Sequence, residues 1–298
     1  MSDFRINKYI SDNSNYSRRQ ADKLIENGRV SINGRLAVNG DKVSDKDSIL
    51  VDGKLLKRKV KNKIYIALNK PKGIVCTTDT RVRNNISDYM GFDSRIFTIG
   101  RLDKDSEGLI LLTNDGDIVN PILRAEFAHE KEYIVRTKRE FDDNFLEKMS
   151  KGVKILSTKT KPCRVWRIKE RTFGIILTQG LNRQIRRMCE ALGHEVSYLQ
   201  RIRIMNISLG NLRVGEYREI GKKELIQLKS LLYTLKDSEN LQNANKDIDK
   251  TNNRSKEDRE NISSLGSEEK EKLRAEAVRS GKAILGPYLS FAQEEDDL

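Results

Sequence analysis

Residues 97–114 read FTIGRLDKDSEGLILLTN. Two apolar runs, 97–99 and 109–112, enclose a loop that holds three carboxylates and two cations. Short apolar runs bounded by glycine are typical of buried strands. A charged loop between two buried strands presents its side chains on a rigid support, as a reactive group requires. A solvated hairpin loop is the simpler interpretation, and the rest of the chain has to decide between the two.

The composition favours a soluble protein of the cytoplasm. The chain has 298 residues, of which 34% are charged, and its mean hydropathy is −0.65. No apolar run approaches the length of a membrane span, and the N-terminus lacks the apolar core of a signal peptide. Cys76, Cys163 and Cys189 are far apart, which favours reduced thiols. With only two histidines besides, the sequence predicts neither a metal site nor a cofactor.

The positive charge is concentrated in the first four fifths of the chain. Residues 237–298 carry 10 basic and 15 acidic residues, which leaves 47 and 29 in residues 1–236. A body this basic favours a polyanionic partner. Ribosomal proteins, DNA-binding proteins and proteins of membrane surfaces share the trait, so charge alone does not identify the partner.

Residues 2–58 predict a small module of two helices and a hairpin. Residues 4–10 place apolar side chains at helical spacing, and Ser17 with Gln20 forms a capping box for a second helix. Asn33-Gly34 between alternating apolar residues is a strong hairpin signal. This order of elements resembles the S4 RNA-binding domain. The resemblance implies salt-dependent phosphate contacts along an RNA stem. The cations that would make them are Arg5, Lys8, Arg18, Arg19, Lys23 and Arg29; a generic solvated surface is the alternative.

The remaining chain divides into a charged linker at 59–63, a second domain at 64–236 and a polar, acidic tail at 237–298 that we expect to be disordered. Strands are expected at 64–68, 74–76, 97–99, 109–112, 132–135, 163–168, 173–178, 196–199 and 202–209, helices at 118–124, 141–150, 182–192 and 224–235, a turn at 69–73 and an exposed loop at 81–85. No regular βαβ repeat is present. The pattern therefore predicts an α+β fold with a mixed, largely antiparallel sheet flanked by helices.

Four segments together carry a resemblance to a known family: 100–103, 129–133, 180–188 and 199–204. They resemble the motifs of the RsuA family of pseudouridine synthases, in which an S4 domain precedes the catalytic domain. Within that family the resemblance is greatest to the branch of the large-subunit synthase F. It extends from about Arg5 to about Leu232. It implies a cytoplasmic, monomeric enzyme that converts a uridine of large-subunit (23S) ribosomal RNA to pseudouridine without a cofactor.

The resemblance also implies three catalytic residues. Asp103 would act at the sugar, Tyr133 would stack on the flipped uracil, and Arg186 would pair with Asp103 and keep it ionised. Exchanging a C–N for a C–C bond needs no redox change, which agrees with the few histidines and cysteines. The residues do not distinguish attack of Asp103 on C1′ from removal of the 2′ proton. On sequence alone, Tyr133 is equally well explained as a core tyrosine.

Three further arginines are predicted RNA contacts. Arg101 would by resemblance fill the space left by the flipped base, and a phosphate contact is an equal alternative. Arg183 and Arg187 lie on the same predicted helix as Arg186, and helical spacing leaves open which arginine faces Asp103.

The other polar residues near these motifs are expected to support the structure. Asp105 and Glu107 would organise the loop, and His129 would cap or pack beside the tyrosine strand. A glycosidase pair of carboxylates is disfavoured by the RNA-binding module. Two alternatives stay open: the same chemistry on small-subunit ribosomal RNA or transfer RNA, and a non-catalytic RNA-binding factor of ribosome assembly.

Overall fold

A computed structural model describes residues 4–57, 62–92, 95–124 and 128–232. Most of the expected linker, the end of the expected last helix and the whole expected tail at 237–298 lie outside the described residues. None of the helices in the described ranges has the length and apolar character needed to cross a membrane.

The N-terminal module consists of β1 (Phe4–Arg5), α1 (Ile6–Asn13), α2 (Arg18–Glu26), β2 (Val30–Ile32), β3 (Arg35–Leu36), β4 (Lys42–Val43), β5 (Ile49–Val51) and β6 (Lys54–Leu55). The predicted capping box is confirmed: the Gln20 amide donates to Ser17 Oγ, and the Ser17 amide donates to Gln20 Oε1. Asn33 and Gly34 both adopt positive φ between β2 and β3, as the predicted hairpin turn requires. The sheet order β3-β2-β5-β6 adds two strands that the sequence pattern did not indicate.

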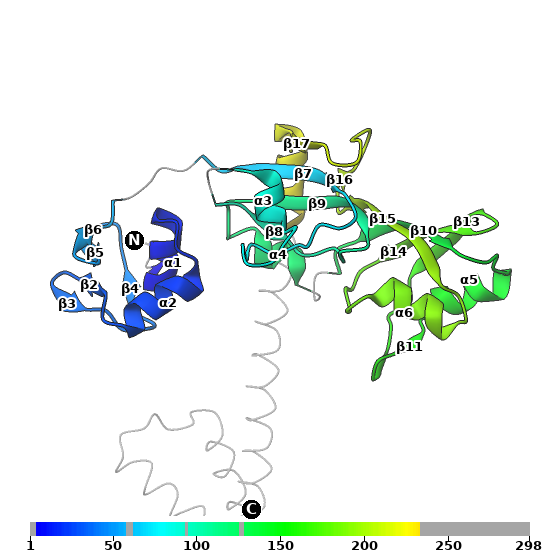
Figure 1. Cartoon of the computed structure of the whole chain (residues 1–298), viewed down its shortest axis with the longest axis horizontal. Coiled ribbons are helices and arrows are strands. Elements are labelled where there is room, and N and C mark those ends of the chain that lie inside the picture. Colours follow the sequence, from blue (N-terminus) through cyan, green and yellow to red (C-terminus); the bar gives the residue numbers. More distant parts are fainter. Residues whose placement is uncertain (1–3, 58–61, 93–94, 125–127, 233–298) are drawn as a thin grey trace, which may run out of the picture. The chain divides into compact units, whose positions relative to one another are not determined.

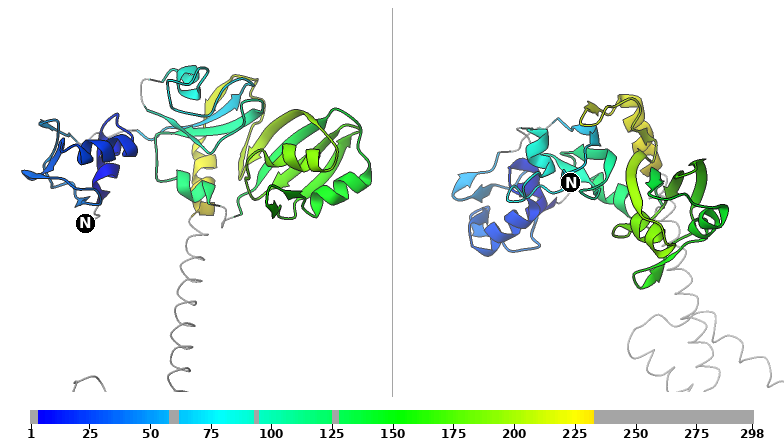
Figure 2. Two further views of the ribbon diagram at one scale, coloured as in Figure 1. Left: turned by 60° about the horizontal axis from the view of Figure 1, so that its bottom comes forward. Right: turned by 45° about the vertical axis from the view of Figure 1, so that its right-hand side comes forward.

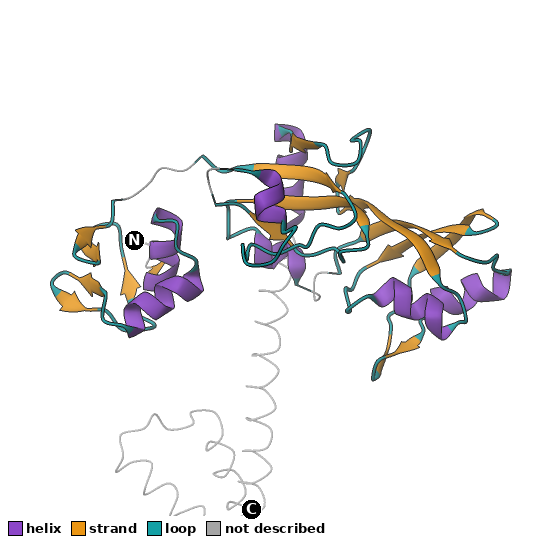
Figure 3. Cartoon of the chain, in the orientation of Figure 1, coloured by secondary structure: helices purple, strands orange, loops and turns teal. Residues whose placement is uncertain are grey.

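The second domain begins with β7 (Tyr65–Lys70), α3 (Ile86–Met90), β8 (Phe97–Ile99), β9 (Glu107–Thr113), α4 (Val119–Leu123), β10 (Lys131–Thr137), α5 (Asp143–Ser150), β11 (Lys154–Ile155) and β12 (Thr158–Lys159). It continues with β13 (Arg164–Lys169), β14 (Thr172–Leu177), α6 (Gln184–Ala191), β15 (Val196–Ile204), β16 (Ile207–Ser208) and β17 (Tyr217–Glu219), and residues 222–232 are helical. Figure 1 labels most of these elements, and Figure 3 colours them by type.

One large sheet organises this domain, in the order β13-β14-β10-β15-β9-β7-β17, with β8 paired to β9 and β16 to β15. Among the described strands of this sheet, only β9 and β15 pair in parallel, at Glu107↔Gln200 and Gly108↔Arg201. The predicted α+β fold with a mixed, largely antiparallel sheet is confirmed. The parallel pair joins the strands β7, β8, β9 and β17 to the strands β10, β13, β14 and β15.

Strand β9 is buried on both faces, which explains its continuous apolar sequence. Leu109 and Leu111 pack into one core with α4 and the helix at 222–232. Ile110 and Leu112 face the opposite core. Each of these four side chains is at most 1% exposed. The loop that precedes β9 is therefore attached to one of the most buried strands of the domain.

Helices α5 and α6 cover one face of the other half of the sheet, as Figures 1 and 2 show. Phe145 and Met149 of α5 and Met188 of α6 pack with Phe173 of β14 in a single core. Phe145 and Met149 are four residues apart and so point to the same side of their helix. This packing fixes α6 against β10 and β15.

The region between β7 and α3 differs from prediction. Lys70 belongs to β7 and is fully buried, instead of lying in a turn at 69–73. Val75 forms only an isolated bridge with Asn85, so the expected strand at 74–76 is wrong. Asn85 caps the unpredicted helix α3 because its side chain accepts a hydrogen bond from the amide of Asp88.

The region 196–209 also differs from prediction. The expected strands 196–199 and 202–209 are one nine-residue strand, β15, followed by the short β16. The polar pair Gln200-Arg201 interrupts the apolar pattern. Arg201 nevertheless stays in the strand, because its buried side chain donates from Nε to the carbonyl oxygen of Leu109 at 2.7 Å.

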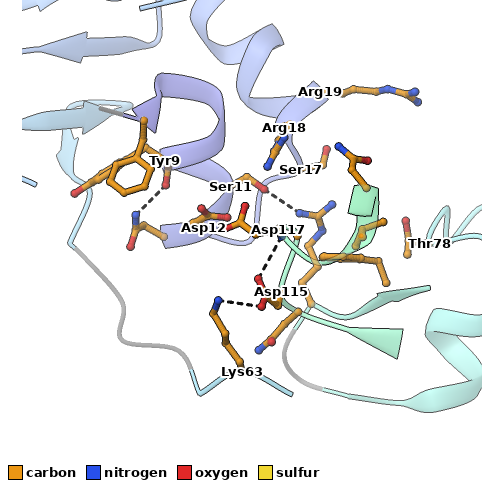
Figure 4. A pocket seen from close by; sticks show the side chains of 18 of the residues that line it. Tyr9, Ser11, Asp12, Ser17, Arg18, Arg19, Lys63, Thr78, Asp115 and Asp117 are labelled. Atoms are coloured by element: carbon orange, nitrogen blue, oxygen red, sulfur yellow. Dashed lines mark hydrogen bonds and ion pairs between the residues drawn. The ribbon is translucent and has the colours of Figure 1, made fainter. Parts of the chain in front are cut away.

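Asp115 ties the start of β7 to the end of β9. It accepts a hydrogen bond from the Tyr65 hydroxyl at 2.6 Å. It also pairs with Lys63, whose Nζ lies 2.9 Å from Asp115 Oδ2 (Figure 4). Burial acts to raise the pKa of Asp115, but the bonds from Tyr65 and Lys63 outweigh it and hold that pKa below its ordinary value. The first strand of the domain is thereby anchored beside the strand that follows the charged loop.

The parallel pairing makes a testable prediction at Gly108. This residue has a φ of +106°, and an added Cβ would overlap the backbone of Arg201. We expect Gly108→Ala to lower the free energy of unfolding by about 3 kcal/mol, as measured by chemical denaturation. Gly180→Ala is the matched control, because no heavy atom of the described residues, apart from Gly180 and its chain neighbours, lies within 4 Å of the point that a Cβ would occupy there. Equal effects of the two substitutions would contradict the steric explanation.

Candidate active site

The loop between β8 and β9 is held by contacts on several sides. Leu102 is buried, and its amide donates to the sulfur of Cys76 at 3.4 Å. The Ser106 amide donates to the carbonyl oxygen of Asp103 at 3.1 Å, and the Gly73 amide donates to that of Lys104 at 2.8 Å. The Asp103 side chain remains 30% exposed. The solvated-hairpin interpretation does not describe this loop, because these contacts fix its backbone and the carboxylate of Asp103 is only partly exposed.

Arg186 of α6 faces this carboxylate. Its Nε lies 3.9 Å from Asp103 Oδ2. Its Nη2 donates to the carbonyl oxygen of Asp105 at 3.1 Å and to Ser106 Oγ at 3.2 Å, and Nη1 donates to the carbonyl oxygen of Val196 at 3.5 Å. The Nε is buried without a hydrogen-bond partner among the described residues. The guanidinium is thus positioned by three neutral oxygens and pairs with Asp103 only at long range.

A second arginine approaches the same carboxylate. Arg183 Nη1 lies 3.9 Å from Asp103 Oδ2 and 3.8 Å from Asp105 Oδ2. Helix α6 begins at Gln184, two residues later than predicted, because Arg183 is its N-cap in a left-handed conformation. Arg187 instead donates to Asn182. The question left open by helical spacing is thus answered by geometry: Arg183 and Arg186 reach Asp103, and Arg187 does not.

Burial distinguishes the two arginines that reach Asp103. The Arg186 side chain is 15% exposed and that of Arg183 is 42% exposed. Burial lowers the pKa of Arg186 and Arg183 adds to this effect, while Asp103 and Asp105 oppose it. Arginine has so high an ordinary pKa that the group stays charged at neutral pH. Arg186 is therefore the fixed cation of the site, and Arg183 is the more accessible one.

Lys70 is a buried cation beside the loop that the sequence pattern did not reveal. Its Nζ donates to the carbonyl oxygens of Pro71 at 2.8 Å and Ile74 at 3.0 Å. Burial lowers the pKa of Lys70, and the charges of Cys76 and Asp103 oppose this. In the sequence, Lys70 follows a predicted buried strand and precedes a proline, which could have indicated a buried lysine. A turn explains the same pattern equally well.

Tyr133 lies where the two halves of the sheet meet. It is half-buried on β10, opposite Arg201 of β15 and Ile175 of β14. Its side chain packs against the core of α5 and α6 and also against the cluster that contains Leu102, the residue before Asp103. The ring is thus packed against both of these clusters and remains partly exposed.

Other predicted residues have structural surroundings. His129 is buried, its Nε2 lies 3.0 Å from the carbonyl oxygen of Pro121, and burial lowers its pKa. Glu107 accepts a hydrogen bond from the Tyr198 hydroxyl, which supports its expected role in the loop.

Arg101 is exposed, and its carbonyl oxygen accepts a hydrogen bond from Arg201 at 3.5 Å. The buried Arg201 thus reaches the loop as well; the sequence analysis singled out the segment 199–204 but gave Arg201 no role.

The predicted cations of the N-terminal module fall into two groups. Arg5, Arg18, Arg19 and Lys23 are exposed. Lys8 and Arg29 form ion pairs within the module, with Asp12 at 2.9 Å and with Asp52 at 2.5 Å. The first group is open to a polyanion, whereas the second group has carboxylate partners already.

The cysteines are poor candidates for catalysis. Burial raises the pKa of Cys163 to about 11 and that of Cys189 to about 12. Burial also raises the pKa of Cys76. Within the described ranges, no group of three or more His, Cys, Asp and Glu residues is placed to hold a metal ion. The described residues instead place the partly exposed carboxylate of Asp103 opposite two arginines.

These pKa values predict unreactive thiols. At pH 8 a thiol with a pKa of about 12 has roughly 10⁻⁴ of its population as thiolate, so alkylation of Cys189 should be at least about 10³-fold slower than that of free cysteine. Iodoacetamide labelling of the native protein with mass-spectrometric mapping tests this, and the same reaction in denaturant provides the control. Rapid labelling of Cys189 in the native protein would contradict the burial of its sulfur.

Comparison with known proteins gives consistent matches. Residues 64–191 match the family described as RNA pseudouridylate synthase, and residues 4–49 match the S4 domain. The chain is 51% identical over 232 residues to the dual-specificity RNA pseudouridine synthase RluF of Escherichia coli (strain K12), which covers 78% of this chain and 80% of that protein. It is 36% identical over 236 residues to the ribosomal large subunit pseudouridine synthase B of Bacillus subtilis (strain 168), which covers 76% and 96%.

The fold has a counterpart among solved structures. A crystal structure of a pseudouridylate synthase is 30% identical, with a TM-score of 0.55, over 76% of this chain and 99% of that one. The extent of this match agrees with that of the resemblance identified from motifs.

Proposed function

Since the chain belongs to the RsuA family of RNA pseudouridine synthases, we propose that it converts a uridine of 23S ribosomal RNA to pseudouridine with Asp103, Tyr133 and Arg186 as its catalytic residues. The general activity, isomerisation of uridine in RNA, follows from membership of the family. The RNA target is supported by the Bacillus subtilis relative, which is named as a large-subunit enzyme. A ribosomal substrate would place the protein in the cytoplasm.

The reaction defines what the site must supply. The N1–C1′ bond of uridine breaks, the base turns, and a C5–C1′ bond forms. C5 then loses its proton and N1 gains one, so atoms and charge balance without an oxidant. The base must leave its stack before any of this can happen, which requires a pocket beside a reactive carboxylate.

The observation that carries the proposal is the opposition of Asp103 and Arg186. The carboxylate is held on its loop, is partly exposed, and faces a largely buried cation at 3.9 Å. Attack on C1′ and removal of the 2′ proton both begin with an ionised carboxylate, which a nearby cation favours. The distance between Arg186 Nε and Asp103 Oδ2 is too long for a hydrogen bond. Arg186 therefore stabilises the negative charge while leaving the oxygens of Asp103 available for the reaction.

Tyr133 and the accessible cations would handle the RNA. The partly exposed tyrosine ring packs against the cluster that contains Leu102 and would offer an aromatic surface for the flipped uracil. Arg183 and Arg101 are exposed beside Asp103, where the phosphates next to that uracil or the space that it leaves would be. Arg187 lies on the same helix and would contact phosphates further along. Both the RNA-binding module and the site belong to one chain, so we propose that a monomer acts.

Asp103→Asn is the most direct test. We expect pseudouridine formation by the purified protein to fall by about 10³-fold or more, because the amide can neither attack nor accept a proton. RNA affinity should change little. Asp105→Asn is the matched control on the same loop, since that side chain is 69% exposed, and we expect its rate within about threefold of the wild type. Wild-type turnover by the Asp103→Asn protein would remove Asp103 from the mechanism.

Arg186→Lys tests the role of the fixed cation. Lysine keeps the charge but cannot donate to Asp105, Ser106 and Val196 from a planar fork. We expect kcat to fall by about 10²-fold, with a smaller change in KM. Arg187→Lys on the same helix is the control, and its kcat should stay within about threefold. A loss that appeared only in KM would indicate an RNA-binding role for Arg186.

A map of pseudouridine in total RNA, with and without the gene, tests the target. We expect one or more sites in 23S ribosomal RNA to disappear. The relative from Escherichia coli is named as a dual-specificity enzyme, so transfer RNA is the second candidate target. Loss of sites only outside the large-subunit RNA would contradict the proposed target while leaving the chemistry intact.

A further inference from the structure

A row of basic side chains extends from the catalytic loop across β15 and β10 to the turn between β13 and β14. We call it the basic strip; its members are Lys72, Arg136, Lys138, Lys169 and Arg171, together with Tyr198. None of them belongs to the motifs from which the function was inferred. The helices α5 and α6 lie on the opposite face of this part of the sheet, because Val135 and Leu199, which alternate with Arg136 and Tyr198, pack in their core.

Tyr198 organises the first part of the basic strip. Lys72 Nζ lies 5.0 Å from the centre of its ring, and the Arg136 guanidinium carbon lies 5.6 Å from it. The hydroxyl of Tyr198 donates to Glu107, so the ring itself is fixed. At these distances the ring face attracts the cations and holds them in place. Unlike a carboxylate, the ring does not neutralise their charge. The ring therefore holds two cations at defined positions around it.

The second part of the basic strip is an open groove of about 940 Å³. Its charged lining consists of Arg136, Lys138, Lys169, Arg171 and Glu170. Lys138 pairs with the exposed Glu195 at 2.7 Å, an interaction that solvent weakens. Four cations against one lining carboxylate leave the groove positive. The backbone beneath it is paired internally, since the Thr137 amide donates to the carbonyl oxygen of Arg171.

Each part of the basic strip has a backbone connection to the site. Lys72 precedes Gly73, whose amide donates to the carbonyl oxygen of Lys104 in the catalytic loop. Ser197 lines the groove and follows Val196, whose carbonyl oxygen accepts from Arg186. The basic strip is therefore continuous with the backbone that positions Asp103 and Arg186.

We propose that the basic strip binds the phosphodiester backbone of the substrate RNA outside the pocket of the flipped uridine, an inference that rests on the proposed function. A succession of cations along an open groove matches the repeating charge of a phosphodiester chain. The Tyr198 ring has cations within reach, so it positions charge and does not serve as a free surface for base stacking. Contacts to phosphate carry no sequence information, so the basic strip fixes the register of the RNA and leaves the choice of uridine to other contacts.

The test removes charge from the far end of the basic strip, at Lys169 and Arg171. Both are exposed at the β13–β14 turn and outside the catalytic machinery. For Lys169→Gln/Arg171→Gln we expect the Kd for a 23S ribosomal RNA transcript to rise about tenfold at about 0.1 M salt. The slope of log Kd against log salt should fall by about 1 to 2, since one or two phosphate contacts are lost. The kcat at saturating RNA should stay within about twofold.

The matched control is Lys154→Gln/Lys159→Gln. These two lysines are exposed and face each other across β11 and β12, and their substitution removes the same net charge from the same domain. We expect neither the Kd nor the salt slope to change appreciably. Equal weakening by both double variants would show attraction by net charge alone, and no weakening by either would show that the RNA runs elsewhere; both results overturn the inference.

Affinity and turnover separate this inference from the proposed function. The Kd and its salt slope are measured without modification, so they test the basic strip even if no pseudouridine forms. Absence of pseudouridine with the wild-type protein would reject the proposed function instead. Circular dichroism of both double variants confirms that any loss of binding does not come from unfolding.

Discussion

Two residues of β9 and two of β15 run side by side in parallel, and this short ladder holds the two halves of the synthase sheet together. It brings the loop before β9 next to the strand that anchors Arg186, and next to β10, which carries Tyr133. Gly108 permits the close approach, and the buried Arg201 reinforces it by donating to Leu109. Every proposed catalytic residue therefore depends on a contact that neither half of the sheet could make alone.

The charged loop is tolerated because its surroundings supply fixed donors and cations. The carboxylates of this loop are balanced by cations from other elements, notably the buried Lys70 and the largely buried Arg186. These cations are in turn held by main-chain oxygens rather than by the carboxylates. A cation fixed in this way keeps its place whether or not a substrate occupies the carboxylate, which is the preorganisation that electrostatic stabilisation requires.

Local signals in the sequence were sufficient for the capping box at Ser17, the hairpin at Asn33 and the strands on either side of Asp103, because each depends on neighbouring residues. Family motifs identified the pairing of Asp103 with Arg186. The sequence could not predict that Lys70 and Arg201 lie in buried strands. Their charged groups donate hydrogen bonds to main-chain carbonyl oxygens, and the apolar pattern of a sequence does not reveal such acceptors. The left-handed N-cap at Arg183 was equally hidden, since residue spacing assumes that a helix has already begun.

The bonds that assemble the site span long stretches of sequence. Two acceptors of Arg186 lie 80 and 81 residues away in the sequence, and Leu109, the acceptor of Arg201 Nε, lies 92 residues away. The N-terminal module, by contrast, closes on contacts among its own residues. During synthesis on the ribosome it can fold first, long before β15 has emerged. A nascent chain would then hold a finished RNA-binding module before its catalytic centre exists, and so could engage RNA before it acquires the means to alter it.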